Sequence, residues 1–184
     1  MTTLPRVVID ACVLANFGAC DLLLRLAEPP RLFIPMWSQT ILDEVHRTQT
    51  TKLGWPAHLA DHFQEQVCHS FPKAMTSDYE DLIPQLSNDP KDRHVLAAAI
   101  RASARSILTF NLKDFPKSAL SLWSISAQHP DDFSLELFQR HSERTTNTLQ
   151  EIASSRNRSL NKHLSHLAKS LPKFSGTIPR IDES

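Results

Sequence analysis

The sequence lacks any hydrophobic run that approaches the ~20 residues needed to cross a membrane, and no signal-peptide pattern precedes its first expected strand. Cysteine is scarce: the three residues are odd in number and contain no Cys-x-x-Cys pair, which argues against a disulfide framework or a zinc site. The formal net charge is zero, so any nucleic-acid binding must come from a local patch. We therefore expect a cytoplasmic protein without membrane contact and with three reduced thiols, Cys12, Cys20 and Cys68.

Strand and helix patterns alternate from the start of the chain. Residues 6–10 form a short β-branched run that ends in Asp10, which is typical of a buried strand. Residues 20–27 are rich in leucine and predict a helix. Residues 32–37 predict a second strand, although Pro35 has no N–H to donate to a central ladder.

Glu44 lies inside the next predicted helix. Ser38 is a favourable N-cap for that helix, and apolar residues recur along one side of it. Another helix is predicted after Pro56 and continues to about residue 70. A glutamate on an amphipathic helix is more often a solvated residue than a ligand, so its position alone assigns it no role.

The dipeptide Asp89-Pro90 predicts the start of a further helix, with aspartate as the N-cap and proline at the first helical position. Asp92 then occupies the third helical position, where an acid also interacts favourably with the helix dipole. The body of this helix, residues 95–104, consists mostly of small apolar residues. We therefore expect it to pack closely on a sheet.

Residues 106–110 predict a strand, and residues 120–127 are a further candidate. Strands and helices that alternate through short connections predict an α/β fold, with a parallel sheet flanked by helices on both faces. Ligands of such sheets bind beyond the carboxyl ends of the strands. Asp10, Asn111 and Asp114 are expected to lie there.

The composition changes near residue 129, so we expect an α/β domain over residues 1–128 and a helical extension over residues 129–184. Helices are predicted at about 131–140 and 159–171, the second with a stripe of leucines on one side. A polar stretch between them also has a helical pattern. From Phe174 onward we expect a loosely ordered tail.

The helical extension is basic over most of its length. No acid occurs between Glu151 and Asp182, where the basic residues are Arg156, Arg158, Lys162, Lys169, Lys173 and Arg180. Such a stretch extends an RNA-binding groove, forms a solvated face or binds a partner, and the sequence leaves these three interpretations open.

Four carboxylates are expected at the rim of the α/β core, on Asp10, Glu44, Asp92 and Asp114. Magnesium and manganese prefer oxygen ligands, and magnesium keeps several of its waters. Such ions lower the pKa of a bound water and stabilise charge on a scissile phosphate. Each acid alone is explained as a turn residue, a helix cap or a solvated side chain. Their joint order and setting favour a metal site.

The order of these acids, ending in Thr109-x-Asn111-x-x-Asp114-Phe115, resembles the PIN domain family of metal-dependent ribonucleases. More narrowly, it is similar to the VapC-type toxins of bacterial toxin–antitoxin pairs. The segments that carry the resemblance are Trp37-Ser-Gln-Thr-Ile-Leu-Asp-Glu44-Val, Asp92-Arg-His-Val-Leu-Ala-Ala-Ala and Thr109-Phe-Asn-Leu-Lys-Asp-Phe-Pro116. The resemblance covers about residues 5 to 128. The extension that begins His129-Pro-Asp-Asp-Phe133 also resembles one appended to a subgroup of these toxins.

The resemblance implies a role for each matching residue. Asn111 would assist the site by hydrogen bonding, with Thr109 in support. Many relatives have Asn or Ser two residues after the first acid, where this chain has Cys12, and a thiol is a weak hydrogen-bond partner. Asp89 ranks below Asp92 as a ligand, because helix capping already explains it. The catalytic residues that bind Mg²⁺ or Mn²⁺ would be Asp10, Glu44, Asp92 and Asp114.

Other polar residues near these segments have two interpretations. Arg93, Lys113 and Thr109 are candidates for substrate binding, the two cations through RNA phosphates, although such cations also serve to offset an acidic cluster. His58 and His62 have the i, i+4 spacing of metal ligands on a helix. No third ligand has a fitting spacing, so surface histidines are favoured.

The resulting hypothesis is a metal-dependent endoribonuclease that acts as the toxin of a type II toxin–antitoxin pair. The resemblance further implies an RNA substrate (tRNA, rRNA or mRNA), an antitoxin protein that blocks the groove, and a homodimer. Two alternatives stay open: a catalytically inactive PIN-like module that binds a partner or RNA, and a DNA-directed nuclease with the same metal chemistry.

Overall fold

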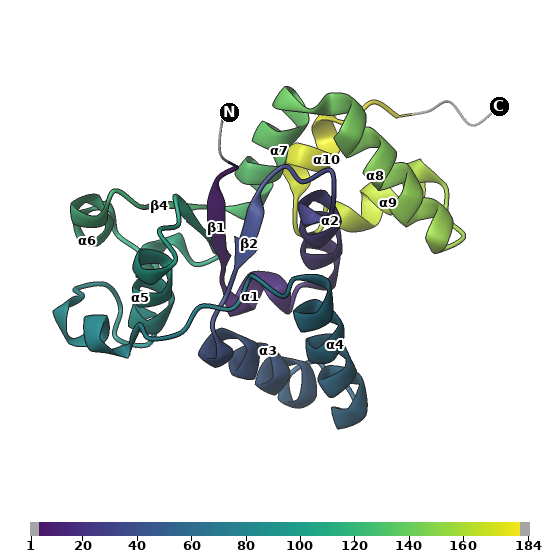
Figure 1. Ribbon diagram of the computed structural model, residues 1–184. Coiled ribbons are helices and arrows are strands. Elements are labelled where there is room, and N and C mark those ends of the chain that lie inside the picture. The colour runs from purple at the N-terminus through teal and green to yellow at the C-terminus, as the bar shows by residue number, and fades with distance from the viewer. Residues whose placement is uncertain (1–3, 181–184) are drawn as a thin grey trace. The chain divides into compact units, whose positions relative to one another are not determined.

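The computed structural model describes residues 4–180, which form two compact units (Figure 1). The first unit consists of the chain up to Ala15 together with Phe33–Gln128, and the second of Asn16–Leu32 together with the chain from His129 onward. The second unit thus includes an early helix as well as the C-terminal ones. The boundary expected after residue 128 stays a prediction. None of the helices in residues 4–180 is long and apolar enough to cross a membrane.

The first unit is built on a four-stranded parallel sheet with the strand order β2-β1-β3-β4. Val8 in β1 pairs with Met36 on one side and with Ile107 on the other. Pro35 lies in β2, an edge strand, which is where proline is tolerated in a sheet. The parallel sheet of the predicted α/β fold is confirmed. The strands are β1 (Arg6–Ile9), β2 (Ile34–Met36), β3 (Ser106–Leu108) and β4 (Ser126–Gln128).

Helices flank this sheet and position the candidate site residues. The helix α5 (Arg93–Arg101) packs against β1 and β3, and its alanines at positions 97–99 are fully buried. Ser38 caps α3 (Gln39–Thr51) by accepting a hydrogen bond from the N–H of Ile41, as its sequence predicts. The other helical elements of this unit are α1 (Ala11–Leu14), α4 (Ala57–Ser70), η1 (Glu80–Gln85), η2 (Leu112–Asp114), α6 (Lys117–Leu120) and η3 (Ser121–Trp123).

The predicted start of α5 is wrong. The helix begins at Arg93 rather than at Pro90, and Asp92 is its N-cap. Asp89 instead closes a turn, because its carboxylate accepts the Lys91 N–H at 3.0 Å and its carbonyl accepts the Asp92 N–H at 2.9 Å. Asp-Pro sequences favour turn initiation as well as helix initiation. The later helix start leaves the Asp92 side chain without a capping hydrogen bond.

The strand expected over residues 120–127 is also wrong over most of its length. The chain stays helical as far as Trp123, and Ser124 then adopts a left-handed conformation with φ 55°. The strand β4 begins only at Ser126. Leu120 is buried from a helix rather than from a strand. A short apolar run does not by itself distinguish these two cases.

The second unit is a set of packed helices. The early helix α2 packs against α8 and α9, while α7 packs against α8 and α10. The helix predicted around residues 131–140 is present. The one predicted over 159–171 is present but ends at Leu167, and its predicted leucine stripe is buried. The elements of this unit are α2 (Phe17–Ala27), α7 (Pro130–Arg140), α8 (Ser142–Ser155), α9 (Leu160–Leu167) and α10 (Pro172–Thr177).

The loosely ordered tail expected from Phe174 is wrong for the residues that the structure describes. Phe174 lies in α10 and is fully buried, with its ring in edge contact with Phe138. The carboxylate of Asp131 accepts the backbone N–H groups of Lys173 and Phe174 at 3.0 and 2.9 Å. This carboxylate caps the start of α10, an arrangement that sequence order hides. Residues 181–184 lie outside the described part of the chain.

Candidate active site

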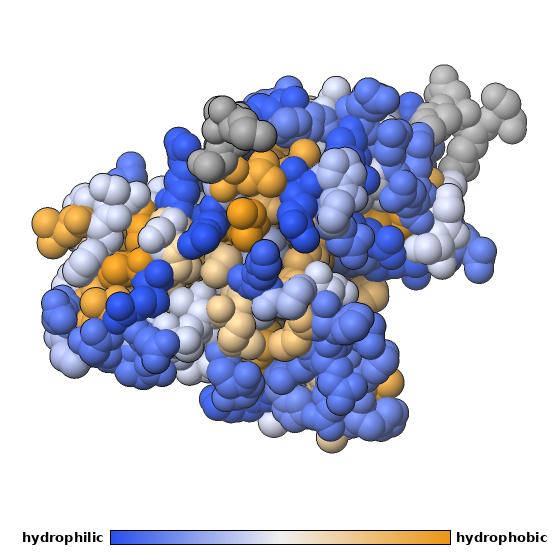
Figure 2. All heavy atoms as spheres, in the orientation of Figure 1, coloured by the Kyte–Doolittle hydropathy of each residue, from blue (hydrophilic) through white to orange (hydrophobic). Residues whose placement is uncertain are grey.

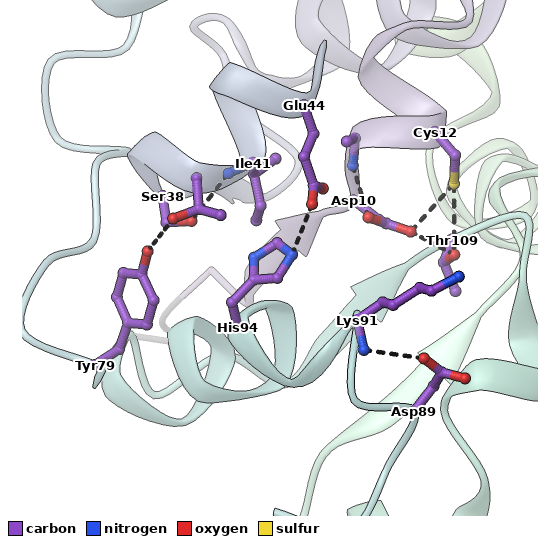
Figure 3. A network of polar contacts seen from close by, with 12 residues as sticks. Asp10, Cys12, Ser38, Ile41, Glu44, Tyr79, Asp89, Lys91, His94 and Thr109 are labelled. Carbon is purple, nitrogen blue, oxygen red and sulfur yellow. Dashed lines mark hydrogen bonds and ion pairs between the residues drawn. The ribbon is translucent and has the colours of Figure 1, made fainter. Parts of the chain in front are cut away.

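Asp10 lies at the carboxyl end of β1, the strand between β2 and β3, and is the N-cap of α1. Its Oδ1 atom accepts the Ala11 N–H at 2.7 Å, and its Oδ2 atom accepts the Thr109 hydroxyl at 2.7 Å. The thiol of Cys12 donates to the same Oδ2 at 3.1 Å. The carboxylate is only 4% exposed. Three donors therefore hold it at the end of the strand (Figure 3).

Thr109 and Cys12 connect Asp10 to the end of β3. The fully buried Thr109 hydroxyl also accepts the Asn111 N–H at 3.0 Å, and the Cys12 sulfur accepts the Phe110 N–H at 3.4 Å. Burial raises the pKa of the Cys12 thiol to about 12, and the charge of Asp10 adds to the shift. The thiol therefore stays protonated and donates. It fills the position at which the family pattern has Asn or Ser.

Burial also raises the pKa of Asp10, and the negative charge of Glu44 adds to this effect. The hydrogen bonds from Thr109, Cys12 and the Ala11 N–H lower the pKa, but burial outweighs them. Such a rise is expected for a carboxylate that is buried without a positively charged partner. Carboxyl groups whose pKa is raised by burial and by a neighbouring charge are found at functional sites.

Asp92 stands at the N-terminus of α5 and shows the largest resolved pKa change among the acids of this site. Its pKa is raised to about 6 by burial first, and then by the charges of Asp10, Asp114 and Asp89, while His94 lowers it. The charges of Asp10, Asp114 and Asp89 affect the pKa of Asp92 because these acids lie near it. The structure thus brings together carboxylates from the ends of β1, α5 and η2.

Glu44 reaches the site from α3 and contacts His94 of α5. The His94 Nε2 atom lies 3.1 Å from the Glu44 Oε1 atom, at ion-pair distance but without hydrogen-bond alignment (Figure 3). His94 is 9% exposed, and its Nδ1 atom has no hydrogen-bond partner among the described residues. The imidazole therefore joins α5 to α3 beside Asp92. Glu44 is near enough to Asp10 to influence its pKa.

Asp114 and Asn111 lie in the segment that follows β3. Asn111 precedes η2 and is exposed, and its carbonyl accepts the Asp114 N–H at 3.0 Å. The carbonyl of Asp114 accepts the N–H of Asp89 at 3.3 Å, which links this segment to the turn before α5. The Asp114 side chain is partly buried, and its charge is among those that raise the pKa of Asp92.

The three residues predicted to bind substrate occupy different environments. Arg93 is partly buried, and its Nε atom donates to the Asn88 carbonyl at 3.3 Å. Lys113 is exposed in η2. Thr109 is buried and bonded to Asp10, so the contact seen is a supporting one. Direct contact of any of the three with RNA stays a prediction.

The chemistry of these donors fits a hard divalent cation. The described residues show no ion pair of Lys or Arg with Asp10, Asp92 or Asp114, so their negative charge is uncompensated by protein. Within residues 4–180, however, no three His, Cys, Asp or Glu side chains form a group ready to enclose a metal ion. Magnesium usually keeps several waters and uses one or two carboxylates, so a closed cage is unnecessary.

The sequence also matches a model of a known protein family. The model described as "PIN domain" matches residues 6–113, more than half of the chain. The chain belongs to the PIN domain family. The matched segment includes Asp10, Glu44 and Asp92 and stops one residue before Asp114.

A curated relative of this PIN domain protein is named "Putative ribonuclease VapC50", from Mycobacterium tuberculosis. The two are 42% identical over 99 residues, which make up 54% of this chain and 57% of the relative. The chain thus spans little more than half the length of the curated relative that it matches. No solved structure matches the chain significantly.

Two contacts of the site were not predicted from the sequence of this PIN domain. The pairing of His94 with Glu44 joins helices that are far apart in the chain, and no spacing rule indicates it. The donation by Cys12 to Asp10 was placed in doubt because thiols are weak donors. The one available signal was position in the chain, because His94 and Cys12 each lie two residues after a candidate acid, Asp92 and Asp10 respectively.

Proposed function

We propose that this protein is an endoribonuclease dependent on Mg²⁺ or Mn²⁺ and that it acts in the cytoplasm as the toxin of a type II toxin–antitoxin pair. One observation carries the proposal: in a PIN domain, burial together with the negative charges of Asp10, Asp114 and Asp89 raises the pKa of Asp92 to about 6. Such repulsion is a cost to the fold unless the site binds positive charge. The name of the curated relative supports the choice of RNA as substrate.

In this proposal the metal ligands come from four elements: Asp10, Glu44, Asp92 and Asp114. Asp10 is the anchor, because three donors fix its orientation and leave no freedom at the end of β1. Thr109 and Cys12 act through Asp10 by holding its Oδ2 atom. His94 acts through Glu44. A bound Mg²⁺ or Mn²⁺ would activate a water and neutralise charge on the scissile phosphate.

Substrate and partner contacts complete the proposal. The exposed cation of Lys113 and the partly buried cation of Arg93 are adjacent in the chain to Asp114 and Asp92, so they are suited to bind RNA phosphates. Asn111 is exposed beside Asp114 and has a side chain able to donate to phosphate oxygens. A cognate antitoxin that covers the acids would suppress cleavage. A homodimer of PIN domains belongs to the same proposal.

The proposal is tested by cleavage of end-labelled single-stranded RNA, tRNA and DNA with Mg²⁺, with Mn²⁺ and with EDTA. We expect the full chain to cut RNA with either metal, to leave DNA intact and to stop in EDTA. The Asp10→Asn variant should give no measurable cleavage, since Asn cannot supply the charge that binds the cation. Asp43→Asn is the matched control, because Asp43 is an exposed acid on the same helix as Glu44.

Three outcomes would contradict the proposal. Cleavage by Asp10→Asn at the wild-type rate would remove the site assignment. Preferential cutting of DNA would favour the DNA-directed nuclease. RNA binding without cleavage under any metal condition would favour the inactive module. For the toxin role, induced expression should arrest bacterial growth with the wild type and not with Asp10→Asn, and co-expression of the cognate antitoxin should relieve the arrest.

A further inference from the structure

One side of α9 in the second unit presents basic side chains to solvent. Lys162, His166 and Lys169 recur at i, i+4 and i+7 along α9 and its following turn, and all three are exposed. The opposite side of the helix is buried, through Leu160, Leu164 and Leu167. Helical spacing therefore separates an apolar side from a basic side. We call Lys162, His166 and Lys169 the α9 basic face.

A further cation lies along the same helix. The guanidinium of Arg180 donates to the Asn161 carbonyl at 2.9 Å and to the Ser165 hydroxyl at 3.1 Å. These two residues lie one position before Lys162 and His166. The segment between α8 and α9 adds Arg158, which is exposed. Hydrophilic side chains also cover most of the visible surface of this unit (Figure 2).

Three aspartates of the second unit have partners other than Lys162 and Lys169. Asp21 pairs with Arg25 at 2.9 Å and also with Arg156. Asp131 is bonded to backbone N–H groups of α10, and Asp132 pairs with Lys173 at 2.6 Å. Among residues 4–180, neither Lys162 nor Lys169 forms an ion pair. The positive charge of the α9 basic face is therefore available to an external anion.

An exposed aromatic ring lies near the C-terminal end of α9. Phe17, the first residue of α2, is 59% exposed, and the Arg156 guanidinium stands 4.5 Å from its ring centroid. Its neighbours contact the end of α9: the Asn16 amide donates to the Ser170 hydroxyl at 2.9 Å, and a Cβ on Gly18 would lie 3.3 Å from Leu167. Phe17 is thus held near Leu167, the last residue of α9, and Lys169 lies in the turn that follows this helix.

We infer that the α9 basic face and Phe17 form a binding surface for unpaired RNA, separate from the carboxylate site. Lysine side chains bind backbone phosphates without regard to sequence, and an exposed aromatic ring beside them stacks an unpaired base. A protein partner fits less well, since lysine is depleted in protein–protein interfaces. This inference rests on the proposed function, because it names a second contact for the RNA that the carboxylates would cut.

The test measures binding without cleavage, by fluorescence anisotropy in EDTA with the full chain. The probe is a single-stranded RNA of about 20 nucleotides, longer than a typical site of ~4–16 nucleotides. We expect Lys162→Glu/Lys169→Glu to weaken binding about tenfold at 0.1 M salt and to reduce the salt slope by about 2, because two phosphate contacts are lost. Lys52→Glu/Lys73→Glu is the matched control, with the same change of charge at exposed lysines of the first unit.

The aromatic contact is tested separately. Phe17→Ala should weaken binding of the single-stranded RNA about fivefold or more and leave binding of a fully paired RNA unchanged, since stacking requires an unpaired base. Leu122→Ala is the control, because Leu122 is 84% exposed in the first unit. Circular dichroism checks the fold of each variant. If the charge reversal impairs folding, Lys162→Gln/Lys169→Gln replaces it.

Unchanged RNA affinity in the Lys162/Lys169 variant would overturn the inference and leave an acidic protein segment as the occupant of this face. An equal loss in the Lys52/Lys73 control would overturn it too, because the effect would then be one of net charge. Neither result contradicts the nuclease proposal, which is tested by the loss of cleavage in the Asp10→Asn variant. Conversely, the wild type could fail to cut RNA while its RNA affinity still depends on Lys162 and Lys169. That result would support the RNA-binding surface and contradict the nuclease proposal.

Discussion

The pKa of Asp92 reflects the burial and the charges of the whole candidate site. Asp92 is the N-cap of α5 but makes no capping hydrogen bond, and burial and then the neighbouring carboxylates raise its pKa. An N-cap acid without its bond and amid like charges weakens the fold. Sites that sacrifice stability in this way are usually functional.

The first prediction concerns Asp92→Asn in metal-free protein. The folded-state pKa of Asp92 is about 6 against an ordinary value of 3.8, so the folded chain binds more protons in this interval. Wild-type stability should therefore fall as the pH rises from about 4 through 6. Asn caps a helix as well as Asp but carries no charge. The variant should match the wild type below pH 4 and exceed it by about 1 kcal/mol at pH 7, a value discounted because the side chain is partly exposed.

The measurement is urea unfolding of both proteins in EDTA at several pH values. A stability difference that is constant with pH, or a less stable variant at pH 7, would show that Asp92 is not under repulsion. Addition of Mn²⁺ at pH 7 should reverse the order, because only the wild type keeps the full set of charges that binds the cation.

The identity of the candidate acids was predicted from the sequence, but their contacts were not. Asp10 and Asp114 follow strands in the chain, and this position predicted that they would lie at one edge of the sheet. The partner of Glu44 is His94, which lies on another helix. Residue type and spacing carry no information on such a contact, because it depends on how α3 and α5 pack.

At the level of elements, α10 is the largest departure from expectation. Its residues looked like a polar tail, yet Phe174 is fully buried and Asp131 caps the helix from α7. The leucine stripe of α9 was visible because it repeats at helical spacing. A lone phenylalanine near the end of the chain has no period, so only the folded structure reveals its partners.

The second prediction follows from this burial. Phe174→Ala should destabilise the second unit by about 3–5 kcal/mol, the usual cost of removing a buried aromatic ring. The measurement is urea unfolding together with limited proteolysis, which should cut the C-terminal helices of the variant earlier. Leu122→Ala is the control, and it should change stability by less than about 0.5 kcal/mol because Leu122 is exposed. Equal stability of the Phe174 variant and the wild type would contradict the packing of α10.

The start of α5 illustrates a different limit. Asp-Pro fits both a helix N-terminus and a turn, and the chain uses the turn. The choice matters for the site, since the helix start at Arg93 makes Asp92 the N-cap and leaves its carboxylate unbonded. The strand β1 was easier to predict than β4, because a β-branched run at buried positions has few alternatives.

The two units of the molecule differ in how much of the PIN domain match each contains. The first unit contains most of the segment that matches the PIN domain model, and the C-terminal helices lie beyond that segment. The segment Asn16–Leu32 belongs to the second unit although it lies between β1 and β2 in the chain. Sequence order suggested a single boundary near residue 128. It gave no sign that an early helix packs with the C-terminal ones, because such packing depends on contacts between distant segments.

The most direct test of the central claim is calorimetric titration of the full chain with Mn²⁺ at pH 7.5. The wild type and Asp43→Asn should bind Mn²⁺ with measurable heat, while Asp10→Asn and Asp92→Asn should show none, because each removes a charge from the cluster that attracts the cation. Lowering the pH through about 6 should weaken binding to the wild type as Asp92 takes up a proton. Undiminished Mn²⁺ binding by both variants, or no binding by the wild type, would contradict a metal site built on these acids.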